Sequence, residues 1–163
     1  MTRDIEVVVG VENVPEAVRT RSTLARIDYA DAVTVASEEI DATPEQWMRA
    51  VLEESRIGQS APRLWQVLGL RLGPRPSSDH VQGWRIAGRG ADWIRVETSS
   101  WMMTGEAVVQ VASRNVSLAL FLRYDSPAGA WVWRVVSVQH RRAVPVMLHQ
   151  AMTVLRSRAA RPC

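Results

Sequence analysis

The sequence predicts an α+β domain in which an antiparallel sheet of about six strands wraps around one long C-terminal helix. From residue 80 onward, apolar residues alternate with polar ones, and Gly, Asn, Asp and Pro separate the runs. After Gln139 the apolar residues recur with the period of a helix. The 163 residues fit one domain, at roughly 150 residues per domain.

The N-terminal part is divided by its patterning. Residues 1–26 are mixed in charge and weakly patterned, which predicts an N-terminal arm or a preceding strand. The main domain is expected over 27–158, and 159–163 are expected to form a flexible tail. The first clear strand is predicted at 31–36, where Val33 and Val35 alternate with small or polar residues.

Two short helices are predicted after this strand. Thr43 can cap the first, Pro44 suits its first position, and Gln46 completes a capping box. The helix is expected to end at Gly58. The second is expected to begin near Ser60 and to end at Gly69.

Five further strands follow with tight turns between them, at 84–86, 94–98, 107–111, 118–122 and 131–135. Because successive side chains of a strand point to opposite faces, these strands have an inward set and an outward set of side chains. The inward set has the large side chains Trp84, Met103, Trp131 and Trp133. The outward set has the acids Glu97 and Glu106, which we expect to be solvated, and the apolar Val108, Phe121, Val136 and Val138. An apolar outer face favours a homodimer.

The terminal helix is predicted from Ala143 to Arg158. One apolar stripe joins Val144, Met147, Leu148, Ala151 and Leu155. Proline is tolerated in the first turn of a helix, so the helix is expected to begin close to Pro145. Its apolar stripe matches the inward face of the sheet, and the strong twist of such a sheet can leave a cavity beneath the helix.

This order of elements resembles the helix-grip fold of the START and birch-pollen-allergen superfamily, which includes polyketide cyclases. More narrowly, the chain is similar to an uncharacterised bacterial family close to that superfamily. Four segments within residues 25–157 carry the likeness: 28–31 (DYAD), 44–47 (PEQW), 83–86 (GWRI) and 138–145 (VQHRRAVP). The resemblance implies binding of an apolar or amphipathic small molecule in the cavity, with catalysis in only some branches of the superfamily.

Composition excludes several chemistries. The 20 basic residues are all arginine, as in high-GC bacterial coding, so no lysine can form a Schiff base or hold a phosphate in a P-loop. The single cysteine, Cys163, is expected to be a spare exposed residue. His80, His140 and His149 lack metal-ligand spacing, so we expect neither a metal nor a cofactor.

Partners and location follow from charge and hydropathy. The net charge of +3 comes from interspersed acids and arginines, which does not favour nucleic-acid binding. No apolar run approaches the roughly 18 residues of a membrane span, and no signal peptide is recognisable. Together with the low cysteine content, these features predict a cytoplasmic location.

The segment His140-Arg141-Arg142 precedes the predicted start of the terminal helix. Two guanidinium groups at a helix N-terminus can bind a carboxylate or phosphate head group. The alternative is structural, in which Asp28 or Asp31 pairs with Arg141 or Arg142 and ties the N-terminal part to the helix. The alternative carries more weight on the sequence alone.

Three hypotheses of function remain open. The first is non-catalytic binding of an apolar or amphipathic molecule, which contacts Trp84, Trp131, Trp133, Met147 and Leu148 while His140, Arg141 and Arg142 meet a polar head group. The second is a cyclase- or hydrolase-like enzyme with His140, or a strand tyrosine or glutamate, as the acid–base group. The third is an interaction protein whose own tryptophans fill the cavity, which a volume below about 300 Å³ would favour.

Overall fold

The computed structural model describes residues 5–37 and 40–161. Its sheet is antiparallel throughout and has the strand order β1-β2-β7-β6-β5-β4-β3. The strands are β1 (Ile5–Val9), β2 (Tyr29–Ala36), β3 (His80–Val81), β4 (Trp84–Arg89), β5 (Trp93–Ser99), β6 (Met103–Val111) and β7 (Asn115–Tyr124). The helices are a 3₁₀ turn (Val11–Asn13), α1 (Glu16–Arg19), α2 (Pro44–Arg49), a π-helical segment (Ala50–Glu54), α3 (Arg56–Val67) and α4 (Pro127–Ala159).

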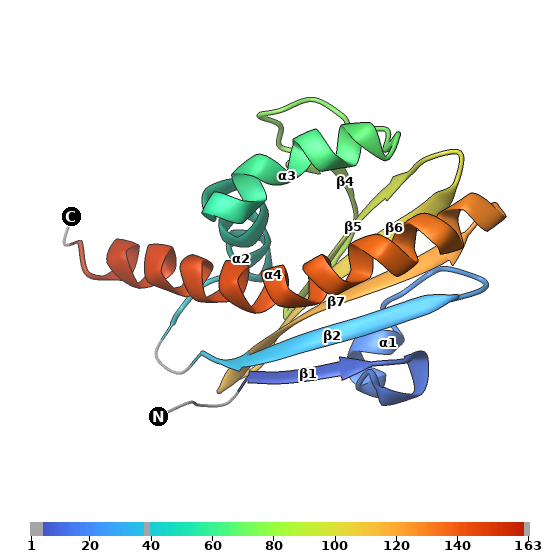
Figure 1. The fold of residues 1–163 in the computed structure, drawn as a ribbon. Helices are drawn as coiled ribbons and strands as arrows, with labels where there is room; N and C mark the ends of the chain where they lie inside the picture. The colour runs from blue at the N-terminus through green and yellow to red at the C-terminus, as the bar shows by residue number, and fades with distance from the viewer. Residues whose placement is uncertain (1–4, 38–39, 162–163) are drawn as a thin grey trace.

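The predicted α+β class and helix-grip arrangement are confirmed. The long helix α4 crosses one face of the sheet, and α3 lies over the same face (Figure 1). The sheet has seven strands instead of about six. One addition is the two-residue strand β3, joined to β4 by the turn Gln82-Gly83, in which both residues have positive φ. Such a turn is typical of a two-residue β-hairpin.

The predicted strand at 131–135 is wrong, because these residues lie in α4. The helix begins at Pro127, which occupies its first turn, and it continues through Pro145 to Ala159. The run Trp-Val-Trp-Arg-Val alternates like a strand. In so short an apolar run, however, periodicity alone does not distinguish a strand from part of a helix. An internal proline costs a helix about 3 kcal/mol. Both halves of α4 bury side chains, from Trp133 to Leu155, and this packing outweighs the cost.

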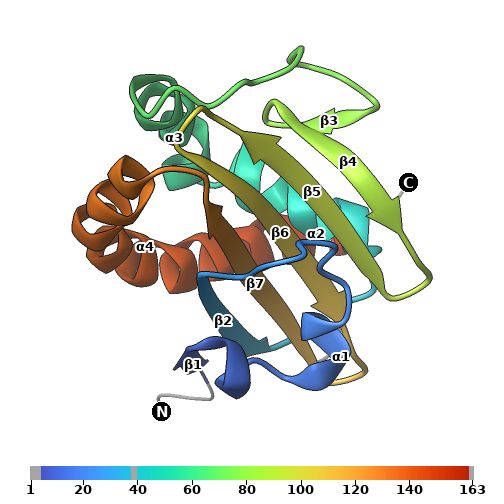
Figure 2. The same cartoon turned by 90° about the vertical axis from the view of Figure 1, so that its right-hand side faces the viewer.

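The outer face of the sheet is covered, which corrects the predicted exposure of Val108 and Phe121. Both side chains are fully buried, in a second core against Val14 and Val18. In Figure 2 the segment that contains α1 crosses one face of the sheet while α2 and α4 lie behind it. This second core removes part of the apolar surface from which a homodimer was predicted. Of the other two outward residues, Val136 and Val138 lie on α4 rather than on a strand.

The same covering segment buries Glu106, which was predicted to be solvated. Its carboxylate accepts hydrogen bonds from the Ser22 hydroxyl at 2.7 Å and from the Thr23 amide at 3.0 Å. The Arg95 side chain lies beside it, with Nε 3.8 Å from Oε1. Of the predicted arm, therefore, Ile5–Val9 is an edge strand and the rest that the structure describes packs on the back of the sheet.

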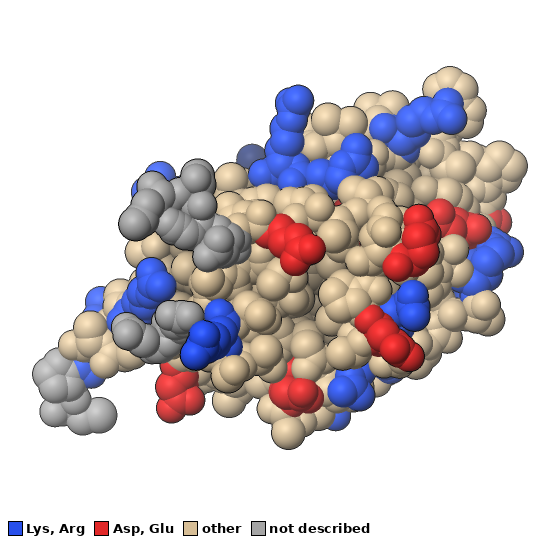
Figure 3. All heavy atoms as spheres, turned by 90° about the horizontal axis from the view of Figure 1, so that it is seen from below, with Lys and Arg blue, Asp and Glu red and all other residues tan. Residues whose placement is uncertain are grey.

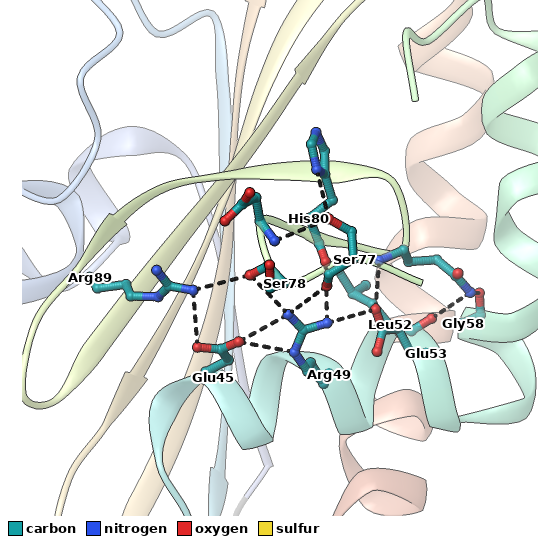
Figure 4. A network of polar contacts seen from close by, with 11 residues as sticks. Glu45, Arg49, Leu52, Glu53, Gly58, Ser77, Ser78, His80 and Arg89 are labelled. Atoms are coloured by element: carbon teal, nitrogen blue, oxygen red, sulfur yellow. Dashed lines mark hydrogen bonds and ion pairs between the residues drawn. The ribbon is translucent and has the colours of Figure 1, made fainter. Parts of the chain in front are cut away.

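A polar network fixes α2 and α3 to the edge of the sheet (Figure 4). The predicted capping box at Thr43 and Gln46 is confirmed. On the next turn, the Arg49 side chain bonds Glu45 and Glu53, and it donates to the carbonyl oxygen of Ser77 at 3.1 Å. The network thereby fixes the position of the segment that leads into α3.

The second helix begins earlier than predicted. Ser55 caps α3 by accepting a hydrogen bond from the Gly58 amide at 2.9 Å, so Pro62 falls inside the helix. A β-carbon at Gly58 would lie 2.4 Å from the Val51 carbonyl oxygen. Glycine is therefore required for close packing here, and it does not end the preceding helix.

Charges of both signs lie on the face of the molecule that Figure 3 shows in full atomic detail. On this face, arginine and acidic residues are interspersed. The domain boundaries at 27 and 158 stay predictions. Residues 1–4 of the predicted arm, and Cys163 with its neighbour in the predicted tail, lie outside the described residues.

Candidate functional site

A cavity of about 560 Å³ lies between the sheet, α3 and α4. The floor comes from the strands, through residues such as Gly105, Ala107, Leu118, Leu120 and Leu122. One wall comes from α3 and the residue that follows it, through Ile57, Ala61, Leu64, Trp65 and Leu68. The opposite wall comes from α4, through Trp133, Val136, Ala143 and Met147. Figure 1 shows the two helices over the same face of the sheet.

Most of the predicted ligand contacts lie in this cavity. Trp84, Trp133, His140, Arg142 and Met147 line it. Trp84 reaches it from β4, and the other four reach it from α4. Their roles in ligand binding stay predictions.

Three predicted contacts lie elsewhere. Trp131 is 71% exposed on the outer side of α4, so its predicted inward position is wrong. The error follows from the strand assignment, because residues 131 and 133 share a strand face but point about 200° apart on a helix. Leu148 is fully buried in the core and does not line the cavity. Arg141 points to Tyr29.

Two aromatic pairs shape the cavity walls. Trp84 meets Trp65 edge to face, with ring centroids 5.5 Å apart. Trp133 meets Tyr29 in the same way at 5.1 Å. The indole N–H groups of Trp84 and Trp133 are buried and have no hydrogen-bond partner within residues 5–37 and 40–161. These tryptophans therefore give the cavity apolar ring surface and no polar atom.

The ionisable residues of the mainly apolar lining include a hydrogen-bonded pair between β2 and α4. Asp31, on β2, has a side chain only 3% exposed, and its Oδ2 lies 3.1 Å from Nε2 of His140 on α4. The Tyr29 hydroxyl donates to the same carboxylate at 2.5 Å. The Arg141 guanidinium donates to the Tyr29 oxygen at 3.3 Å. A buried carboxylate thus joins strand to helix at the edge of the cavity.

Tyr29 is held in its protonated form. Burial raises the pKa of its hydroxyl well above 10.0, and the neighbouring Asp31 carboxylate raises this pKa further. A neutral phenol can keep donating its proton to Asp31 throughout the physiological range. Tyr29 is therefore a fixed hydrogen-bond donor that orients the carboxylate.

The anion site predicted at a helix N-terminus is wrong in its geometry. His140, Arg141 and Arg142 lie near the middle of α4, where each backbone N–H is already used within the helix. The structural alternative predicted that an aspartate pairs with Arg141 or Arg142. Asp31 does pair with this segment, but its partner is His140. Asp28 pairs instead with Arg26, with Nε 3.1 Å from Oδ2.

Arg142 reaches the cavity from its rim. It is exposed, and within the described residues its guanidinium has no acidic partner. Asp31, His140 and Arg142 are the only ionisable groups among the cavity-lining residues. The cavity therefore combines a mainly apolar interior with ionisable groups that come from α4 and β2.

Sequence reasoning missed the wall that α3 provides and the position of Asp31 inside the cavity. Leu64 and Trp65 were recognisable as apolar helix residues, but only the fold shows which face they cover. Asp31 carried a usable signal, because it is a charged residue at an inward position of a strand with Val33 and Val35.

The described residues also bear on metal binding and on membrane insertion. Within the described part of the chain, no three His, Cys, Asp or Glu residues are grouped so that they could hold a metal ion. No helix within it has both the length and the hydropathy needed to cross a membrane.

No protein-family model matches the chain, and no curated protein is similar to it in sequence. Among solved structures, it is similar to the di-domain ARO/CYC BexL from the BE-7585A biosynthetic pathway, at 17% identity and a TM-score of 0.38. That match covers 74% of this chain and 45% of BexL, so the chain spans less than half of that protein. It is also similar to an uncharacterised protein from Rhizobium leguminosarum, at 16% identity and a TM-score of 0.26, covering 78% and 97% of the two chains. Neither likeness is close enough to support a function.

Proposed function

We propose that this domain binds an apolar or amphipathic small molecule in the cavity between the sheet and α4. The observation that carries the proposal is the cavity itself. Its volume of about 560 Å³ lies within the roughly 300–1,000 Å³ of small-molecule sites. Its lining is mainly aliphatic and aromatic with a few polar groups, which is the usual composition of such a site.

The cavity volume also favours this proposal over the alternative of an interaction protein whose own tryptophans fill the cavity. An interaction protein whose tryptophans fill its interior would leave less than about 300 Å³. Trp84 and Trp133 instead stand at the edges of the open space and pack on Trp65 and Tyr29. Trp131, which was expected to help fill the interior, is on the outside.

An enzyme with His140 as its acid–base group is the second candidate. The contact between His140 and the buried Asp31, at the edge of the cavity, is the observation that favours it. The arrangement of sheet and helix also supports membership of the START and polyketide-cyclase superfamily, which stays a proposal. The cytoplasmic location and the homodimer are likewise predictions.

Tryptophan fluorescence tests the binding proposal, because Trp65, Trp84 and Trp133 line the cavity. The protein should show saturable changes in emission with fatty acids of increasing length and with planar aromatic compounds. Ala107, on the cavity floor, offers a blocking variant. Ala107→Phe should abolish the saturable change, since a phenyl group would occupy the cavity.

The matched control is Ala159→Phe, which places the same aromatic group on an exposed residue at the end of α4. This variant should bind like the unmodified protein. The proposal would be rejected if no compound in the panel gave a saturable signal, or if Ala107→Phe, shown by circular dichroism to be folded, bound with unchanged affinity.

A further inference from the structure

Asp31 and His140 have the geometry of a base held ready for a proton. The buried carboxylate lies 3.1 Å from Nε2 of His140, which favours a ring that carries a proton on Nε2. The other ring nitrogen, Nδ1, then has a free lone pair. Within residues 5–37 and 40–161, Nδ1 of His140 has no hydrogen-bond partner.

Asp31 is fixed from a second side. Its Oδ2 also accepts from Tyr29, which in turn accepts from Arg141. Such a chain of oriented donors holds the carboxylate in place. A positive charge on the imidazole ring would therefore meet a negative charge already at contact distance.

The cavity offers a matching position for an anion. His140 and Arg142 both line it, and Arg142 has no acidic partner within the described residues. The lining residues from α3 and from β4 to β7 are all uncharged. Apart from Asp31, the charged or titratable groups in this cluster are Tyr29 on β2 and, on the helix of His140, Arg141 and Arg142. None of these three carries negative charge.

We infer that the cavity binds weakly acidic amphipaths, such as alkyl phenols or enols, as their anions, with His140 as the proton acceptor. The O–H bond of the ligand breaks, its electron pair stays on the oxygen, and the proton passes to Nδ1 of His140. Asp31 is a positioning residue that holds the resulting imidazolium, and Arg142 faces the anion from the cavity rim. Charges then alternate from Asp31 through His140 and the ligand oxygen to Arg142.

The inference rests on the proposed function, because it specifies which molecules the same cavity takes. A carboxylic acid is already ionised at neutral pH and needs no base. Phenols and enols are mainly neutral there, so only for them does a fixed imidazole add to binding. A buried anion also needs compensating charge, which the apolar remainder of the cavity cannot supply.

A coloured probe tests this directly. The phenolate of 4-hexyl-2-nitrophenol absorbs at longer wavelength than its neutral form, so the absorption spectrum reports its ionisation in the bound state. Its methyl ether has no acidic proton and reports binding to the cavity alone. We expect the protein to lower the apparent pKa of the bound phenol by about one to three units, as nearby opposite charges do.

The variants separate base, positioning group and fold. His140→Gln should remove the shift in the probe pKa while the methyl ether still binds. Asp31→Asn should reduce the shift, because the imidazolium loses its counter-charge, and binding of the ether shows whether this variant is folded. His149→Gln is the matched control, since His149 is exposed on the same helix and does not line the cavity; it should leave the shift unchanged.

Each outcome decides the matter. Binding of the ether with no shift in the phenol pKa would overturn this inference and leave the proposed function standing. A shift that survives in His140→Gln would also overturn it, because the base would then be another group. Failure of both compounds to bind would overturn the inference and the proposed function together.

Discussion

Glu106→Ala is expected to destabilise the protein strongly, because it removes the hydrogen bonds that hold the N-terminal segment on the back of the sheet. Glu106 is 1% exposed and accepts hydrogen bonds from Ser22 and from both the amide and the hydroxyl of Thr23. Arg95, only 12% exposed, would lose its carboxylate partner. Removing one member of a buried pair costs about 3–5 kcal/mol.

Urea denaturation followed by tryptophan fluorescence measures this loss. Folded domains are stable by about 5–15 kcal/mol, so a loss of 3–5 kcal/mol is a large fraction of the total. With a urea dependence of about 2 kcal/mol per molar, the midpoint should fall by roughly 2 M. The substitution should leave the cavity unchanged, since Glu106 lies on the other face of the sheet from Ala107 and does not line the cavity.

Glu97→Ala is the matched control, because Glu97 pairs directly with Glu106 in the strand register. Glu97 is partly exposed and bonds the exposed Arg85. Surface pairs of this kind contribute about 0–1 kcal/mol. The reasoning would be refuted if Glu106→Ala cost less than about 1 kcal/mol, or if the two variants lost equal stability.

Three further outcomes are expected. Phe121→Ala should cost about 3–5 kcal/mol in urea denaturation, because its ring is fully buried under the N-terminal segment, whereas Trp131→Ala should change stability by less than about 0.5 kcal/mol; similar losses would contradict the covered back face. Thr43→Ala should lower stability by about 0.5–2 kcal/mol through loss of the α2 cap, as measured by thermal unfolding, and no change would contradict a functioning cap. In an alkaline titration followed by tyrosinate absorbance, burial should keep the pKa values of both tyrosines, Tyr29 and Tyr124, above 10.0. Because these folded-state values exceed the unfolded one, their contribution to stability is present below about pH 10 and is lost as pH rises through the folded pKa; ionisation of either residue at its ordinary value would contradict the burial.

The sequence predicted those parts of the fold that depend on local chemistry. The Thr43 cap, the strand at Val33 and Val35 and the apolar stripe around Met147 needed only patterns of adjacent residues. The start of α4 could not be predicted in the same way. Trp131 to Val135 fits both periods, and only packing along the whole helix decides between them.

The candidate site was predicted in part, for the same reason. Trp84 and Met147 line the cavity from the predicted strand and helix, whereas Trp133, His140 and Arg142 line it from a part of α4 that was not predicted to be helical. The pairing of Asp31 with His140 joins residues far apart in the chain, so no local pattern contains it. The burial of Phe121 and Glu106 also depends on where a distant and weakly patterned segment docks.

The most direct test of the cavity is a crystal structure of the protein with 12-bromododecanoic acid. Anomalous scattering locates the bromine without reference to the rest of the density. We predict a bromine peak inside the cavity, between Leu120 on the sheet and Met147 on α4, with the carboxylate toward Arg142. A peak outside α4 beside Trp131, or an interior closed by its own side chains, would contradict the account.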